Sequence, residues 1–247
     1  ISVGDDVASK SFLAQKKKTA EKLGIDFRLY EFGADISSDE LRKEVGRIST
    51  QSRCGGVILQ LPLPEHISAQ YALNAILPEK DVDVLGERAL GAFYAGRSKV
   101  LPPSVAVVEE ILKKTSVDLP QSTVAVVGAG RLTGKPIATW LLGKAKEVIV
   151  LDKGSDFSKL KYADVVICGA GVVGLIKPEM LKEGAGVIDF GYGKNADGKT
   201  SGDLDLSFLQ AENCKLCSPS FYTPTPGGTG PILVAKIIEN FYKLNKF

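Results

Sequence analysis

Short apolar runs alternate with amphipathic stretches along most of the chain, and this alternation restricts the possible folds more than any other feature. The apolar runs predicted to be strands are Ile1–Val3, Ile25–Phe32, Val57–Leu61, Thr123–Gly128, Glu147–Asp152, Val165–Gly169, Gly186–Gly191 and Lys215–Ser218. The stretches predicted to be helices are Ser9–Leu23, Ser38–Ile48, Ser68–Ile76, Val105–Lys114, Gly134–Leu142, Pro178–Lys182 and Pro231–Leu244. Strands that alternate with helices form parallel sheets of βαβ units, so the sequence predicts an α/β protein.

A pair of prolines marks the expected boundary between two domains. Pro102 and Pro103 follow each other and interrupt regular structure, and a chain of 247 residues is long enough for two modest domains. We therefore expect one domain over residues 1–102 and a dinucleotide-type domain over residues 103–230.

Composition and charge argue against several classes of protein. The net charge is +2 and the densest basic run is Lys16–Lys18, so no nucleic-acid-binding surface is expected. No apolar run reaches the ~18 residues of a membrane span, and no signal peptide is visible. The cysteines suggest no disulfide framework, which predicts a cytoplasmic location. Because the chain opens on an apolar strand without methionine, residues are expected before Ile1.

Two of the four cysteines have the spacing of half a zinc site. Cys214 and Cys217 are separated by two residues, but the chain has no second pair, and His66 is the only histidine. Strand cysteines explain the pair better, so no metal is expected.

A glycine-rich turn predicts where a dinucleotide binds. The apolar run Thr123–Gly128 leads into Gly128, Ala129, Gly130 and Gly134, where a helical pattern begins. Glycines let the backbone approach a pyrophosphate, and the helix N-terminus supplies N–H groups and a positive dipole end. The spacing GxGxxxG is one residue longer than the common fingerprint. The alternative is a tight turn without a ligand.

An acidic residue follows the next predicted strand. Asp152 stands roughly 20 residues downstream of the turn, where a carboxylate can hydrogen-bond the adenosine ribose. A carboxylate repels a 2′-phosphate and favours NAD, although Lys153 and Arg131 could offset that repulsion. The expected cofactor is NAD(P), with a preference for NAD.

One lysine interrupts the apolar stripe of the first predicted helix. Lys16 follows Phe12 and Leu13 by four and three residues and precedes Ala20 and Leu23 by four and seven. Loss of hydration on this stripe would lower the pKa of the ammonium group and permit proton transfer near neutral pH. Periodicity alone favours the alternative, snorkelling, in which the stem is buried and the head reaches water.

Further polar residues lie where a ligand is expected. Gln60 stands near the carboxyl end of a predicted strand, at the edge where α/β proteins bind ligands, and the alternative is a core amide. Asp81 and Asp83 follow a loop. The alternative to a ligand-binding role is that these carboxylates cap a turn, which is the commoner case. The proline- and glycine-rich segment Thr223–Pro231 predicts a binding turn at the start of the last helix, with Pro231 at its first position.

These motifs, in this order, resemble the bifunctional methylenetetrahydrofolate dehydrogenase/methenyltetrahydrofolate cyclohydrolase family of one-carbon metabolism. The matching pieces are Val3–Ser9, Lys16, Gly55–Pro64, Pro78–Asp83, Gly186–Gly191, Gly202-Asp203 and Thr223–Pro231. The resemblance implies two α/β domains around a cleft, the second a Rossmann-like doubly wound parallel sheet, with helix 231–247 packing back on the first. It also implies a homodimer that oxidises 5,10-methylenetetrahydrofolate to the methenyl form and hydrolyses that to 10-formyltetrahydrofolate.

The resemblance assigns roles to individual residues. Lys16 matches the catalytic lysine, Gln60 the glutamine that hydrogen-bonds it, and Asp83 the aspartate that grips the pterin. Phe12 stands where the family has a tyrosine and keeps its stacking face. The other residues expected at the folate are Leu59, Leu61, Pro226, Gly227, Gly228 and Gly230. The residues expected at the dinucleotide are Gly128, Ala129, Gly130, Gly134, Asp152, Tyr192 and Thr223.

The departures from the family pattern lie mainly on the dinucleotide side. The family has arginine and serine at Ala129 and Gly130, and a His-Ser pair at Asp152 and Lys153. These losses favour NAD or weaker dinucleotide binding. The alternatives are therefore a protein with cyclohydrolase activity alone, a non-catalytic folate-binding relative, and a two-domain dehydrogenase for another small substrate.

Overall fold

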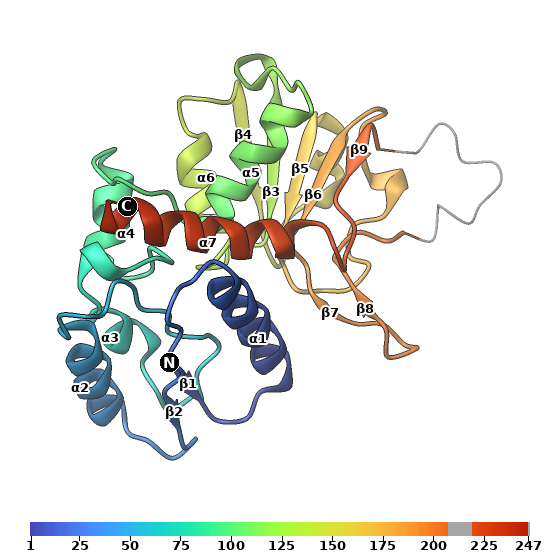
Figure 1. The fold of residues 1–247 in the computed structure, drawn as a ribbon. Coiled ribbons are helices and arrows are strands. Elements are labelled where there is room, and N and C mark those ends of the chain that lie inside the picture. Colours follow the sequence, from blue (N-terminus) through green and yellow to red (C-terminus); the bar gives the residue numbers. More distant parts are fainter. Residues whose placement is uncertain (207–218, 247) are drawn as a thin grey trace. The chain divides into compact units, whose positions relative to one another are not determined.

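The computed structural model describes residues 1–206 and 219–246, except for the side chains of residues 7 and 8 (Figure 1). The chain divides into two compact units, Ile1–Pro103 with Val234–Phe247, and Ser104–Leu233. The predicted strand Lys215–Ser218 and the cysteines Cys214 and Cys217 lie outside the described residues. No described helix has both the length and the apolar character needed to cross a membrane.

The first unit consists mainly of helices and extended segments around one core. Its elements are β1 (Ser2–Val3), α1 (Val7–Lys22), β2 (Glu31–Phe32), α2 (Ser38–Ser49), α3 (Ala69–Leu73), the 3₁₀ helix η1 (Pro78–Lys80), α4 (Glu87–Tyr94) and most of α7 (Thr229–Asn245). Local sequence explains where the helices start. Asp6 caps α1 by accepting from the Ser9 N–H, and Ser37 and Glu40 form a capping box at α2.

The predicted strands of the first unit are mostly wrong in extent. Of Ile25–Phe32 only Glu31–Phe32 pairs with β1, in the register that places Ser2 opposite Glu31 and Val3 opposite Phe32. Val57–Leu61 is not a strand: Val57 makes a single bridge to Asp81, and the Gln60 N–H donates to the Ile1 carbonyl at 2.9 Å. Pro62 and Pro64 lack the N–H groups that a longer ladder needs.

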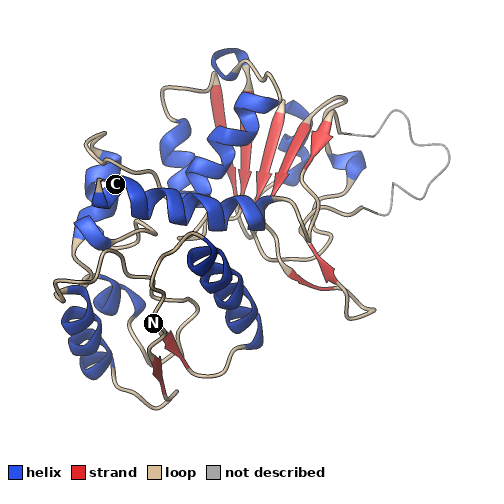
Figure 2. Cartoon of the chain, viewed as in Figure 1, coloured by secondary structure: helices blue, strands red, loops and turns tan. Residues whose placement is uncertain are grey.

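The second unit is built on a five-stranded parallel sheet (Figure 2). The strand order is β4 (Glu147–Leu151), β3 (Thr123–Val127), β5 (Val165–Cys168), β6 (Gly186–Asp189) and β9 (Phe221–Tyr222). The other elements are α5 (Pro103–Lys114), η2 (Leu119–Gln121), α6 (Gly134–Leu141), η3 (Phe157–Tyr162), η4 (Pro178–Met180), β7 (Gly193–Lys194) and β8 (Thr200–Ser201). β3, β5 and β6 are buried throughout, as their largely apolar sequences predict. The α/β fold class is confirmed.

Several boundaries differ from the sequence predictions. Pro178–Lys182 forms only the 3₁₀ turn η4. The last helix begins at Thr229 rather than Pro231, which still occupies its first turn, where a missing N–H costs nothing. The sequence prediction missed helix α4 and strand β9.

Candidate active site

Lys16 lies on the buried face of α1. Ser9, Leu13, Lys16 and Ala20 are all buried, and only 4% of Lys16 is exposed. Its Nζ donates a hydrogen bond to Gln60 Oε1 at 3.1 Å. Burial lowers the pKa of Lys16, and the negative charge of Asp83 opposes that shift. The ammonium head is therefore held inside the unit, and the snorkelling interpretation is wrong.

One residue predicted on the apolar stripe of α1 is not buried. Leu23 is the C-terminal cap of α1 rather than part of its buried face, and it is 53% exposed. Phe12 is half-buried, and its ring centroid lies 4.8 Å from Lys16 Nζ. At this distance the ring face stabilises the charged form of the lysine, so Phe12 contributes to the electrostatics of the site.

Gln60 is fixed at both ends of its amide. Its Oε1 accepts from Lys16, and its Nε2 donates to the Leu61 carbonyl at 2.7 Å. The Ser9 hydroxyl donates to that same carbonyl at 3.3 Å. The amide orientation follows from these partners, because only the NH₂ group can donate to a carbonyl. Leu61 is half-buried, whereas the Leu59 side chain is 2% exposed and belongs to the hydrophobic core.

Asp81 and Asp83 have different environments although one residue separates them. Asp83 is half-buried, and its charge acts on Lys16. Asp81 is buried, and its Oδ2 accepts from the N–H groups of Leu85 at 3.0 Å and Gly86 at 2.8 Å. Asp81 therefore closes the turn that leads into α4, as the turn-cap alternative predicts, and Asp83 is left as the carboxylate associated with the lysine.

Burial gives Asp81 a testable effect on stability. Desolvation raises its pKa from 3.8 to about 6, and the nearby Asp83 charge acts in the same direction. The folded protein thus binds a proton more tightly than the unfolded chain, and this stabilisation is complete below pH 3.8 and lost as the pH rises through 6. Relative to Asp81→Asn, the wild-type protein is expected to lose about 2–3 kcal/mol of unfolding free energy over that window.

Urea unfolding of both proteins at a series of pH values, followed by circular dichroism, measures this difference. Asp118→Asn removes an exposed carboxylate and serves as the control. If the unfolding free energies of the wild type and Asp81→Asn changed with pH in parallel, the raised pKa of Asp81 would be contradicted.

The glycine-rich turn in the second unit leaves no space for side chains at two positions. Gly128 has φ +90, and a Cβ there would lie 2.9 Å from the Ala170 backbone. A Cβ on Gly134 would lie 1.7 Å from the Gly128 carbonyl oxygen. Thr133, the residue before α6, makes no side-chain cap. Bare backbone and an uncapped helix start are the features that a pyrophosphate requires, so the residues fit a dinucleotide.

The remaining residues predicted at the dinucleotide are more open. Gly130 and Asp152 are exposed, Ala129 is half-buried, and Tyr192 is 54% exposed. Asp152 directly follows β4 instead of ending it. The Thr223 hydroxyl accepts from the Asp189 N–H at 2.7 Å, so this side chain also holds the end of β6.

The proline- and glycine-rich segment wraps around the end of the same strand. Gly227 has φ +98, and a Cβ on Gly228 would lie 2.4 Å from the Pro224 carbonyl oxygen. The Thr229 hydroxyl donates to the Asp189 carbonyl at 2.8 Å. Pro226 and Gly227 are exposed, Gly228 and Gly230 are half-buried, and no atom lies within 4 Å of a Cβ built on Gly230. The segment therefore presents open backbone beside the carboxyl end of β6.

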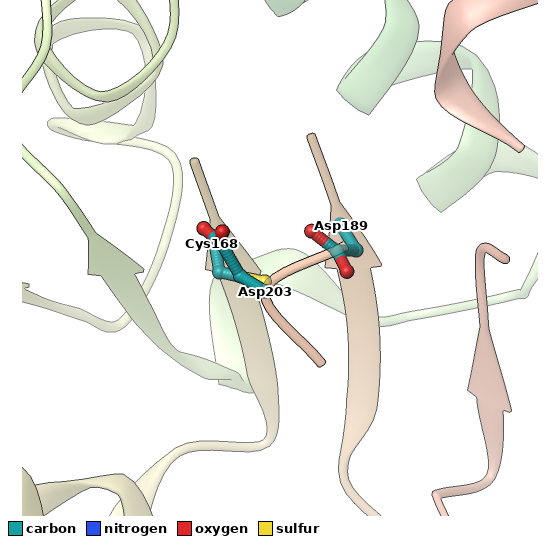
Figure 3. A group of neighbouring side chains, drawn as sticks. All are labelled: Cys168, Asp189 and Asp203. Carbon is teal, nitrogen blue, oxygen red and sulfur yellow. The ribbon is translucent and has the colours of Figure 1, made fainter. Parts of the chain in front are cut away.

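The described part of the chain contains one cluster of three potential metal ligands, namely Cys168, Asp189 and Asp203. Figure 3 shows Cys168 and Asp189 on neighbouring strands, with Asp203 on an adjoining loop. Asp189 accepts from the N–H groups of Gly191 and Leu204. Burial raises the pKa of Cys168 well above its ordinary value, and the charges of Asp189 and Asp203 act in the same direction.

Asp203 has a similar structural explanation. Its carboxylate accepts from Ala170 at 2.6 Å, Gly171 at 3.2 Å and Val172 at 2.8 Å. Burial raises its pKa, and the charge of Asp189 raises it further, while these N–H groups lower it. We infer that Asp189 and Asp203, through these hydrogen bonds to backbone N–H groups, fix the loops at the carboxyl end of the sheet.

Sequence reasoning assigned no role to several buried polar residues. Ser104 donates to the Leu132 carbonyl at 2.6 Å and supports the glycine-rich turn. Asn240, on α7, donates to two backbone carbonyls. Asp189 interrupts an apolar strand, and Asn240 interrupts an apolar helix face next to Ile237 and Ile238. A polar residue within an apolar pattern was the available signal in both cases.

Comparisons with known proteins agree with this geometry. The tetrahydrofolate dehydrogenase/cyclohydrolase catalytic domain matches residues 1–83, and the tetrahydrofolate dehydrogenase/cyclohydrolase NAD(P)-binding domain matches residues 102–247. The bifunctional protein FolD of Bacillus licheniformis is 38% identical over 100% of this chain and 85% of its own length.

Two solved structures have closely similar folds. The bifunctional enzyme FolD, methylenetetrahydrofolate dehydrogenase/cyclohydrolase, from Campylobacter jejuni aligns with a TM-score of 0.90 and 33% identity, covering 99% of this chain and 86% of that one. The N5,N10-methylenetetrahydrofolate dehydrogenase-cyclohydrolase of Trypanosoma brucei, complexed with NADP cofactor and inhibitor, aligns with a TM-score of 0.90 and 28% identity over 99% and 84%. The chain therefore belongs to the tetrahydrofolate dehydrogenase/cyclohydrolase family, and its second domain is of the NAD(P)-binding type.

Proposed function

We propose that this protein oxidises 5,10-methylenetetrahydrofolate with a nicotinamide dinucleotide and hydrolyses the methenyl product to 10-formyltetrahydrofolate. The observation that carries the proposal is the buried contact between Lys16 and Gln60, near the charge of Asp83. Membership of the family and the names of its relatives support both activities. The alternatives without catalysis are less favoured, because the proposed catalytic set is present.

The hydrolytic half depends on residues of the first unit. The methenyl group is an electrophilic cation, and a water that attacks its carbon must lose a proton. Lys16 accepts that proton in its neutral form, which its lowered pKa makes accessible, and Gln60 orients the amine. The Asp83 carboxylate pairs with the neighbouring N–H donors of the pterin edge, and Phe12 stacks on the benzoyl ring.

The oxidative half depends on positioning. A nicotinamide dinucleotide, when bound, supplies the hydride acceptor. Gly128, Ala129, Gly130 and Gly134 would hold its pyrophosphate with bare or nearly bare backbone. Tyr192 and Thr223 of the same unit would contact the rest of the dinucleotide.

The preferred dinucleotide is proposed to be NAD. Asp152 is exposed directly after β4, where its carboxylate can accept from the ribose hydroxyls and repel a 2′-phosphate. Arg131 and Lys153 are also exposed and act in the opposite direction, so the preference is expected to be modest. We further propose that the protein works in the cytoplasm as a homodimer, with folate catalysis in the first domain and dinucleotide binding in the second.

Two assays on the same preparation test the proposal. Incubation with methylenetetrahydrofolate and either dinucleotide is expected to produce methenyl absorbance and reduced nicotinamide, with NAD giving the higher kcat/KM. With the protein and no dinucleotide, methenyltetrahydrofolate is expected to lose its absorbance faster than it does in buffer. Calorimetric titration with NAD and NADP, with and without folate, measures the cofactor preference.

The outcomes distinguish the alternatives. Hydrolysis without reduction of either dinucleotide would indicate a cyclohydrolase alone. Folate binding without either reaction would indicate a non-catalytic relative, and dinucleotide binding without folate binding would favour a dehydrogenase for another substrate.

A further inference from the structure

The loop that carries Asp83 is neither strand nor helix and is held from two sides. From within the loop, Asp81 binds the N–H groups of Leu85 and Gly86. Val84 adopts φ 55, a conformation that a β-branched residue rarely takes without outside support. A further contact comes from a distant part of the chain.

Asn240 of α7 supplies that contact within the first unit. Its side chain is 2% exposed, and its Nδ2 donates to the Val82 carbonyl at 2.9 Å and to the Leu101 carbonyl at 2.8 Å. Both acceptors are carbonyl oxygens, so only the NH₂ group of the amide can face them. The two N–H donors of this buried amide are thus both used on backbone.

The Val82 carbonyl belongs to the same planar peptide unit as the Asp83 nitrogen. Because that unit is rigid, a bond that fixes the oxygen also fixes the direction in which the Asp83 Cα leaves the loop. Asp83 in turn exerts its charge on Lys16. A displacement of the peptide would therefore move the carboxylate relative to the lysine.

We propose that Asn240 is a positioning residue for Asp83: through the Val82–Asp83 peptide it sets where that carboxylate meets the folate. This inference rests on the proposed function and extends it to a residue far along the sequence from the folate-side set. Asn240 touches no reacting atom and acts only through Asp83.

The alternative is a purely structural role for Asn240. The same helix provides a matched comparison, because Asn245 Nδ2 also donates to two carbonyls, those of Gly55 at 2.8 Å and Phe241 at 2.7 Å. Neither acceptor belongs to the Asp83 loop. Asn245→Leu therefore removes a similar pair of hydrogen bonds without releasing Asp83.

The test uses Asn240→Leu, which keeps the branching of the side chain at Cγ but removes both donors. The KM for methenyltetrahydrofolate is expected to rise about tenfold, the effect of losing one well-placed hydrogen bond, whereas the Kd for NAD should stay unchanged. Asn245→Leu should leave this KM unchanged. If the leucine variant does not fold, Asn240→Ala is measured in its place.

A double-mutant cycle separates positioning from general destabilisation. In an Asp83→Asn background, Asn240→Leu is expected to change the folate KM by less than about twofold, because the group through which it acts is already altered. The inference would be overturned if Asn240→Leu raised KM by the same factor in the Asp83→Asn background as in the wild type. It would also be overturned if Asn245→Leu raised KM as much as Asn240→Leu does. Either result would leave the proposed function intact. A wild-type protein that neither binds nor hydrolyses methenyltetrahydrofolate would overturn both.

Discussion

Lys16→Met is expected to lower kcat for methenyltetrahydrofolate hydrolysis by about 10²–10⁴-fold, the usual contribution of a positioned acid–base group. Methionine keeps most of the apolar stem of lysine but has no amine to accept the proton of the attacking water. The reason for a large effect is the burial of the amine, which lowers its pKa and leaves Gln60 as its hydrogen-bond partner. Stopped-flow loss of methenyl absorbance measures the change.

Stability measurements keep this result from being confused with misfolding. Because burial lowers the pKa of Lys16, its charged form destabilises the folded protein at pH values below that pKa. This destabilisation disappears as the pH approaches the ordinary lysine value of 10.5. Lys16→Met should therefore unfold at no lower urea concentration than wild type at neutral pH. Lys18→Met, on the exposed face of α1, is the matched control and should retain full activity. Unchanged hydrolysis in Lys16→Met would remove the proposed role of the lysine.

Gly134→Ala is expected to weaken NAD and NADP binding by about 10²-fold, the scale of a 1 Å displacement at a site that depends on orientation. The added methyl group would lie 1.7 Å from the Gly128 carbonyl oxygen, so the turn and the start of α6 must move apart. Calorimetric titration of each dinucleotide measures the loss. Hydrolysis of methenyltetrahydrofolate should persist, because its proposed catalytic residues belong to the other unit.

Gly91→Ala provides the control for that experiment. It adds the same methyl group on the exposed face of α4, where no atom lies within 4 Å of the new Cβ, and dinucleotide binding should change by less than about threefold. Equal losses in the two variants would show that the effect does not come from the close approach at Gly134. No loss in Gly134→Ala would contradict the location of the pyrophosphate.

The features that the sequence predicted well are governed by residues close together in the chain. The place of Lys16 on the buried face of its helix followed from its spacing from Leu13 and Ala20, but the burial of its head did not, because periodicity alone favoured snorkelling. The glycine-rich turn followed from a strand, a turn and a helix that are contiguous in sequence. In both cases local periodicity and the steric requirements of glycine were sufficient.

Other features were not predictable because they depend on pairing between distant segments. Val57–Leu61 has the composition of a strand, but whether it forms a ladder depends on partners at Ile1 and Asp81. Asp81 and Asp83 could not be distinguished by spacing alone, since Leu85 and Gly86 decide which carboxylate is used by the backbone. The contact between Asn240 and Val82 spans 158 positions, beyond the range of any local pattern.

The unit that contains Lys16 is made of two stretches that are far apart in sequence, Ile1–Pro103 and Val234–Phe247. The ribosome synthesises the whole second unit between them, so the carbonyl groups of Val82, Leu101 and Gly55 are made well before the side-chain amides that bind them. The second unit, whose residues are contiguous, is complete in sequence before the later stretch is made. The first unit can therefore complete its core only after the second unit has been synthesised.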